Sequence, residues 1–187
     1  TTATSVLGFY FKLQSFIFMP DFGLNNGMIP IISYKYGARN MKRLIETGRL
    51  ATSSAIGMMI VGFVVFQLFP TQLLGLFNAS KAMIEIGVPA LRIISISFIL
   101  AGFSIVCGST FQALGKGVLS LMTSVVRQLI VLLPVAFILS LFGNVHTVWF
   151  AFPIAEVFSL TLGIIFLIKT LKQVEIEMNE SEIEIIE

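Results

Sequence analysis

Residues 16–40 read FIFMPDFGLNNGMIPIISYKYGARN, an apolar stretch that is interrupted near its middle by Pro20, Asp21, Asn25 and Asn26. Each of these four residues would destabilise a helix in the core of a soluble protein. A proline removes a backbone hydrogen bond, and a buried polar group needs a partner. How these residues are accommodated therefore depends on whether water or lipid surrounds the chain.

The composition indicates that lipid covers much of this chain. The 187 residues are 56% hydrophobic and 12% charged, with a mean hydropathy of +0.95. A soluble domain has about 25% charged residues, so this chain has too few to cover its surface for water. The single cysteine, Cys107, excludes an internal disulfide framework, and the formal charge of +2 does not indicate nucleic acid.

The beginning of the sequence, Thr-Thr-Ala, has no initiating methionine and no signal-peptide pattern. We therefore expect a fragment or a processed product.

Several apolar runs are long enough to cross a bilayer, which takes about 20 residues. Backbone groups in lipid must bond within their own segment, and barrel strands need only about 10 residues, so the runs predict transmembrane helices. The alternative is a set of buried helices in a large soluble protein. The sequence thus predicts an all-α, polytopic helical bundle of about five spans, at residues 6–32, 50–69, 86–112, 118–142 and 148–168.

Basic residues alternate between the predicted connections. Residues 34–49 are rich in Lys and Arg, and Lys116, Lys169 and Lys172 follow the third and fifth runs, whereas residues 143–147 hold no Lys or Arg. Basic connections stay in the cytoplasm, so the pattern predicts an external start and a cytoplasmic C-terminus. Five spans that end this way suggest that a partner span, or a whole preceding half, is missing.

We divide the chain into a transmembrane bundle, residues 1–173, and an acidic cytoplasmic tail, residues 174–187. Acids alternate with isoleucine in the tail, which predicts a solvated, partly disordered segment. The alternative is an electrostatic contact between the tail and the basic connection at residues 34–49.

The polar residues of the first run predict a bent helix that borders a cavity. Pro20 and Pro30 remove helix hydrogen bonds, and a GxxxG spacing at residues 23–27 permits close approach of a neighbouring helix. Asn25 and Asn26 cluster between the prolines, where freed backbone and amides suit a cavity wall. The alternative is a structural kink whose amides bond to adjacent helices.

Three ionisable residues lie inside predicted spans: Asp21, Arg127 and Glu156. An ionised side chain at the bilayer centre costs at least about 2.5–3.5 kcal/mol, so it rarely faces lipid. Pro134 lies beyond Arg127 and Pro153 precedes Glu156, and both prolines predict helix kinks.

We therefore expect Asp21 and Glu156 to face an interior cavity for substrate or ion, together with Gln112 at the end of the third run. Arg127 either lines the same cavity or extends to the cytoplasmic interface. A buried carboxyl that exchanges a proton for a cation or a cationic substrate would supply the chemistry that an antiporter needs.

No catalytic constellation is visible in the sequence. One cysteine and one histidine form no convincing metal site or nucleophile–base pair, and there is no phosphate-binding GxxxxGK[ST] motif. We expect no enzyme activity, no metal and no cofactor.

Three stretches carry a resemblance to a known family: FIFMPDFGLNNGMIPIISYKYGARNMKR, ALRIISISFILAGFSIVCGSTFQALGKG and VWFAFPIAEVFSLTLGIIF. They resemble the second, fourth and last helices of a half-domain in the multidrug and toxic compound extrusion (MATE) family. The resemblance implies helices eight to twelve of twelve, in the C-terminal lobe of an exporter of the cell membrane. Such transporters exchange amphipathic or cationic drugs for Na⁺ or H⁺ by alternating access between two lobes.

The sequence also departs from the family pattern. Sodium-coupled members have an acid in the helix that residues 86–112 resemble, whereas Phe103 and Ser104 stand near that position here. Asp21 stands where an apolar residue such as valine is expected. The resemblance therefore leaves the coupling ion open between Na⁺ and H⁺.

Three other functions remain open at this point. The chain could belong to a lipid-linked oligosaccharide or polysaccharide flippase of the same superfamily, or to a membrane-embedded enzyme that uses Asp21 and Glu156 as an acid pair. It could also be a nonfunctional truncated product.

Overall fold

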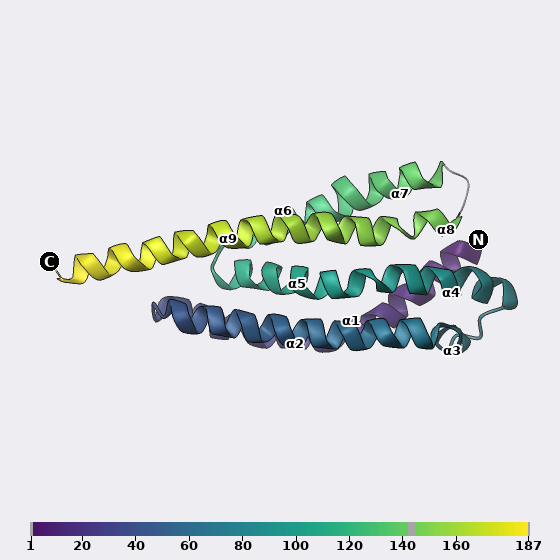
Figure 1. Cartoon of the computed structure of the whole chain (residues 1–187), viewed down its shortest axis with the longest axis horizontal. Coiled ribbons are helices and arrows are strands. Elements are labelled where there is room, and N and C mark those ends of the chain that lie inside the picture. Colours follow the sequence, from purple (N-terminus) through teal and green to yellow (C-terminus); the bar gives the residue numbers. More distant parts are fainter. Residues whose placement is uncertain (1, 142–144, 187) are drawn as a thin grey trace.

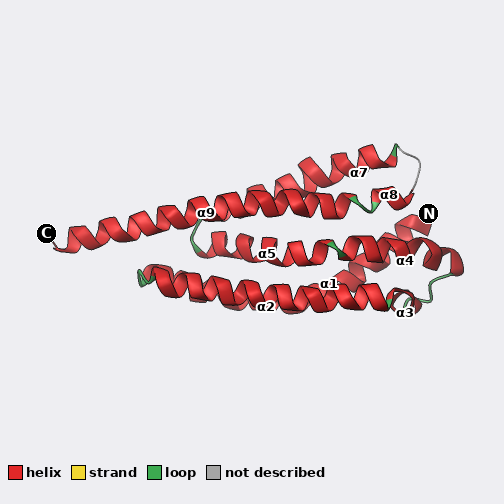
Figure 2. Cartoon of the chain, viewed as in Figure 1, coloured by secondary structure: helices red, strands yellow, loops and turns green. Residues whose placement is uncertain are grey.

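The structure is a computed structural model of the whole chain, and it describes residues 2–141 and 145–186. Every regular element in this part of the chain is helical (Figure 2), which confirms the predicted all-α fold. The elements, in chain order, are α1 (Thr2–Gly37), α2 (Met41–Leu68), α3 (Pro70–Gly75), α4 (Lys81–Ser95), α5 (Ser97–Ala113), α6 (Gly117–Val125), the π-helix η1 (Val126–Leu132), α7 (Leu133–Ser140), α8 (Val145–Val148) and α9 (Ala151–Ile186).

The helices form an elongated bundle in which α5 lies between α2 and α9 (Figure 1). The helix α1 packs against α2, α4 and α5, and its first half slants across the bundle. Pro20 and Pro30 lie inside α1 without interrupting it. Two apolar clusters hold the bundle together: Phe18, Phe66 and Phe98 belong to one, and Ile32, Leu44 and Val106 to the other.

Tight turns join the antiparallel helices. The turn after α5 places Gly115 at φ 73°, and the N–H of Lys116 donates to the carbonyl of Phe111 at 2.8 Å. This is a Schellman ending, which favours glycine at the left-handed position. The turn after α1 has the same left-handed ending, with Arg39 at φ 53°. The Asn40 side chain then caps the start of α2.

Length and apolar composition support most of the predicted spans. Among the described residues, Met41–Leu68, Gly117–Ser140 and His146–Asn179 are each long and apolar enough to cross a membrane, and α4 with α5 would form a fourth, bent span. The helix α1 has the length, at 36 residues, but is not among these candidates. Its internal prolines, acid and amides lower its mean hydropathy. That α1 crosses the membrane therefore stays a prediction from the sequence.

The span made of α4 and α5 bends by 46° at Ile96. Ser97 Oγ donates to the carbonyl of Ile94 at 2.6 Å, and Gln67 Nε2 donates to the carbonyl of Arg92 at 2.9 Å. Side chains thus satisfy carbonyls near the bend, which is a requirement for a broken helix in lipid.

The two prolines predicted as kinks in the last two spans lie in different settings. Pro134 is the second residue of α7 and lies inside the continuous helical segment Gly117–Ser140, so a kink there stays a prediction. Pro153 lies in the first turn of α9, where a proline costs little because its missing N–H has no partner. Pro153 therefore accompanies a break between α8 and α9 rather than a bend inside one helix.

The predicted disordered tail is wrong for the residues that the structure describes, because α9 remains helical to Ile186. Val174 and Met178 are buried against the ends of α1, α2 and α5. The hydroxyl of Tyr36, in the last turn of α1, donates to Glu177 Oε2 at 3.0 Å, so the tail contacts residues 34–49 through a tyrosine. An electrostatic contact with the basic residues of this connection stays a prediction. Apolar side chains on one face of the acidic segment explain the ordered packing.

The basic connections share one end of the bundle. The α1–α2 turn, the α5–α6 turn and the free end of α9 lie together, opposite the N-terminus and α3 (Figure 1). Lys116 Nζ donates to Gln173 Oε1 at 2.7 Å across this end. The structure thus agrees with the alternation of charge, and the predicted cytoplasmic side of this end stays a prediction.

A candidate transport cavity

A polar cavity of about 290 Å³ lies between α1, α5, α6 with η1, and α9. Helical periodicity explains why these residues meet. Positions 22, 25, 26 and 29 share one face of α1, and positions 104, 105, 108, 109 and 112 share one face of α5. The lining residues are Phe22, Asn25, Asn26, Ile29, Ser104, Ile105, Gly108, Ser109, Gln112, Ser120, Thr123, Ser124, Arg127 and Ser159.

The lining offers amides and hydroxyls with one charged residue, Arg127. Gln112 Nε2 donates to Ser120 Oγ at 3.2 Å, which links α5 to α6 inside the cavity. Ser104 Oγ and Asn25 Oδ1 are buried without a hydrogen-bond partner among the described residues. Buried polar atoms normally have partners, so these two atoms are available to a ligand, an ion or water.

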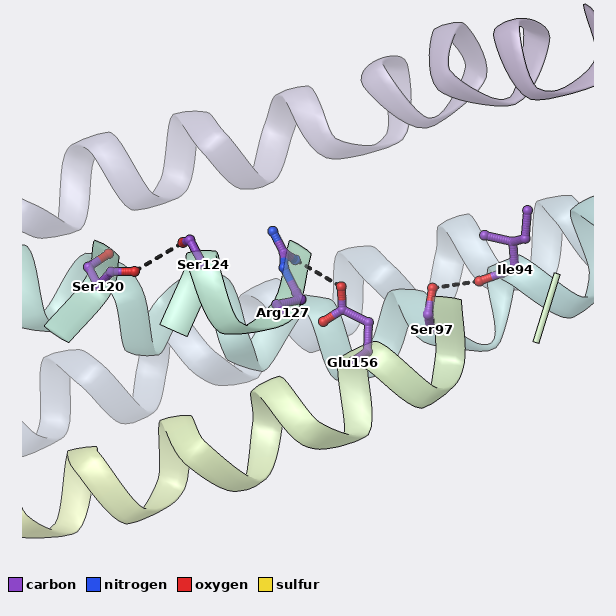
Figure 3. A network of polar contacts seen from close by, with 6 residues as sticks. All are labelled: Ile94, Ser97, Ser120, Ser124, Arg127 and Glu156. Carbon is purple, nitrogen blue, oxygen red and sulfur yellow. Dashed lines mark hydrogen bonds and ion pairs between the residues drawn. The ribbon is translucent and has the colours of Figure 1, made fainter. Parts of the chain in front are cut away.

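Arg127 and Glu156 form an ion pair between η1 and α9. Arg127 Nη1 donates to Glu156 Oε1 at 2.8 Å, and Figure 3 shows the two side chains directed toward each other. The Arg127 side chain is 33% exposed and the Glu156 side chain 13%. Glu156 Oε2 is buried and has no partner among the described residues. The arginine therefore binds only one of the two carboxylate oxygens.

The π-helix positions this arginine. The segment η1 (Val126–Leu132) is a wider, i→i+5 bonded stretch that ends two residues before Pro134. Such π segments are rare and are frequently found at functional sites. Arg127 belongs to η1 and lines the polar cavity, so the π-helix is part of the cavity wall.

A second cavity of about 340 Å³ lies beside the ion pair, and Arg127 and Glu156 both line it. Its other lining residues come from the first half of α1, from η1 and α7, and from the start of α9; they include Phe11, Gln14, Trp149 and Phe152. The ion pair thus lies between a hydroxyl- and amide-rich cavity and an aromatic one.

Asp21 is fully buried in α1, and neither carboxylate oxygen has a hydrogen-bond partner among the described residues. Asn25 lies one turn later, but its Nδ2 donates to the main-chain oxygen of Asp21, at 2.8 Å, and not to the carboxylate. An unpaired buried carboxylate is costly, and the described residues do not supply the partner that a charge at this position would need.

The structure gathers four of the six predicted cavity residues, Asn25, Asn26, Gln112 and Arg127, around one cavity. Asp21 is buried beside Asn25 in α1, and Glu156 contacts the cavity through Arg127.

Sequence reasoning missed the hydroxyl-bearing residues of the cavity, including Ser104, Ser109, Thr123 and Ser159. Their signal is weak, because serine and threonine in a membrane helix often bond to their own backbone, as Thr123 also does here.

No group of three or more His, Cys, Asp or Glu side chains in the described part of the chain is arranged to hold a metal ion.

Comparison with known proteins identifies the class. The MatE family model matches residues 1–138, which is most of the chain. The chain therefore belongs to the MatE family, and its long apolar helices indicate a membrane protein.

Individual relatives agree with this assignment. The multidrug export protein MepA of Staphylococcus aureus is 26% identical over 148 residues, which cover 79% of this chain and 32% of MepA. The MATE multidrug transporter DinF-BH, solved in complex with a ligand, is 37% identical with a TM-score of 0.81, over 91% of this chain and 38% of DinF-BH. An outward-facing multidrug resistance MATE transporter of the MOP superfamily gives a TM-score of 0.88 at 20% identity, over 93% and 40% of the two chains.

The chain thus spans about a third of the length of the curated relatives it matches. These relatives are described as transporters and not as enzymes.

Proposed function

We propose that this chain forms the C-terminal lobe of a secondary active transporter of the cell membrane, which exports amphipathic or cationic drugs in exchange for Na⁺ or H⁺. The observation that best supports the proposal is the polar cavity inside an otherwise apolar bundle, next to two largely buried carboxyl groups. Ionisable residues inside membrane segments usually mark a substrate or ion pathway, which favours a transport role over a purely structural bundle.

Alternating access requires a second lobe that closes over the cavity from the opposite side. Because 79% of this chain matches 32% of MepA and 91% of it matches 38% of DinF-BH, both relatives are about two and a half times as long as this chain, which is consistent with a missing partner lobe. We infer that the N-terminal lobe supplies the other wall of the substrate site.

The two acids have different roles in this mechanism. Glu156 is held by Arg127, so a proton or a cation that reaches Glu156 competes with an existing ion pair. Asp21 has no partner to displace among the described residues. Ion or proton exchange at either acid would change the charge next to the polar cavity and so couple ion movement to substrate release.

The test uses the full-length transporter that contains this chain, reconstituted in vesicles with an imposed Na⁺ or H⁺ gradient and a fluorescent cationic dye. We expect gradient-driven efflux, and we expect Glu156→Gln to remove most of it while insertion and folding stay normal. Glu46→Gln, an exposed acid in α2, is the matched control and should transport normally.

Normal efflux in Glu156→Gln would remove this residue from the coupling mechanism. Efflux by the 187-residue chain on its own would contradict the need for a second lobe.

A further inference from the structure

A mostly apolar groove of about 330 Å³ is lined by residues of α1, α2, α5 and α9. Leu44 and Gly48 line it from α2, Phe103 and Cys107 from α5, and Leu171 from α9. Figure 1 shows the arrangement, with α5 between the other two helices. A membrane protein presents such a groove to lipid chains, because no water competes for an apolar surface in the bilayer.

The groove is separate from the candidate transport cavity. Ser104 and Gly108 of α5 line the polar cavity, whereas Phe103 and Cys107 line the groove. Residues three and four positions apart share a helix face, so the cavity and the groove lie on different faces of the same helix. A ligand in the groove would therefore not be the transported substrate.

Arg49 is the one charged residue that lines the groove. Its side chain is exposed and makes no ion pair within the described part of the chain. In the sequence it directly precedes the apolar run of α2, which predicts a place at the membrane boundary, and it belongs to the basic stretch that also holds Lys42 and Arg43. A guanidinium here attracts an anionic headgroup and repels a cationic drug.

We propose that this groove binds a phospholipid with an anionic headgroup, with an acyl chain between α2 and α9 and the phosphate on Arg49. The groove has a volume of about 330 Å³. Two turns of a helix with its side chains would need roughly 850 Å³, for a cylinder about 10 Å wide and 11 Å long, so a thinner hydrocarbon chain suits the groove better than a protein helix. The basic end of the bundle favours the anionic leaflet of the membrane.

Two glycines of α2 provide a matched pair of variants. A Cβ built at Gly48 meets no atom within 4 Å, so a larger side chain there extends into the groove without displacing the protein. Gly57 also has open space around its Cβ, but it does not line the groove. Both substitutions by leucine replace a helix-interior glycine, which favours the helix in each case.

The experiment places the chain in phosphatidylcholine vesicles that contain a small fraction of a lipid with a photoactivatable diazirine in its acyl chain. The headgroup of that probe is either phosphatidylglycerol or phosphatidylcholine, and labelled peptides are then quantified. We expect residues of the groove to be labelled about fivefold more by phosphatidylglycerol, which corresponds to about 1 kcal/mol for one arginine at the membrane surface.

Arg49→Gln should bring the two probes to equal labelling, whereas Arg43→Gln, a basic residue outside the groove lining, should not. Gly48→Leu should reduce groove labelling by both probes severalfold, and Gly57→Leu should leave it unchanged. Equal labelling by the two probes in the unmodified chain would overturn the headgroup assignment. Undiminished groove labelling in Gly48→Leu would overturn the groove itself as the binding site.

Discussion

Replacement of Asp21 by asparagine separates a functional role for this residue from a structural one. Both carboxylate oxygens of Asp21 and Oδ1 of Asn25 are buried without partners among the described residues. An asparagine at position 21 has the shape of aspartate, and its amide N–H groups lie one helical turn from Asn25 Oδ1, a spacing at which amide side chains bond to each other.

The expected magnitude follows from these unpaired atoms. A buried polar group without a partner costs about 1–3 kcal/mol, and Asp21→Asn removes an ionisable group and can satisfy one acceptor. We therefore expect the free energy of unfolding to rise by about 1 kcal/mol, a shift of roughly 2–4 °C in Tm for a chain of this size. Transport by the full-length protein should fall at the same time, because the ionisable group is lost.

The assay is thermal unfolding of the chain in detergent micelles, alongside dye efflux by the full-length transporter. Glu46→Gln, which removes an exposed acid, should change stability by less than about 0.5 kcal/mol. A loss of several kcal/mol in Asp21→Asn would refute the reasoning, because it would mean that the carboxylate makes stabilising bonds. Greater stability with undiminished efflux would leave Asp21 without a coupling role.

Three other predictions concern the ion pair, the tail and the orientation. Arg127→Met and Glu156→Leu should each cost about 1–3 kcal/mol, less than a fully buried pair because Arg127 is 33% exposed. In denaturant unfolding, the double variant should lose about 1–2 kcal/mol less of the free energy of unfolding than the sum of the two single losses. If the two losses simply add, the ion pair contributes nothing. The Glu177 carboxylate, through its hydrogen bond, raises the pKa of Tyr36. Because the pKa of Tyr36 is higher when the tail is docked on α1, docking is stabilised at any pH below the ordinary pKa of tyrosine. This stabilisation is lost as the pH rises from that ordinary value through the raised pKa. Proteolysis of the tail should therefore accelerate above about pH 10, and Tyr36→Phe, unlike Tyr34→Phe, should remove that dependence. Finally, cysteines that replace Lys42 and Thr147 in a Cys107→Ser background should react with impermeant reagents from opposite sides of the membrane. Labelling from one side would contradict the predicted topology.

The sequence was most informative where structure depends on neighbouring residues. Apolar runs of a length that matches the bilayer predicted the helices, because backbone groups in lipid must bond within their own segment. The amides of α1 predicted a cavity wall for a similar reason, since Asn25 and Asn26 must avoid lipid whichever helices surround them. These properties are local, so they can be read without knowing the packing.

The packing of distant segments was decided by the tertiary structure alone. The Arg127–Glu156 pair joins residues 29 positions apart, and the Tyr36–Glu177 bond joins residues 141 apart. Nothing in either local sequence specifies the partner, because each contact exists only once α1, η1 and α9 lie side by side. The same holds for the groove at Arg49, whose apolar walls come from helices that are distant in sequence. Helix formation in lipid follows from backbone hydrogen bonds within each segment, whereas the choice of neighbours depends on side-chain packing between segments.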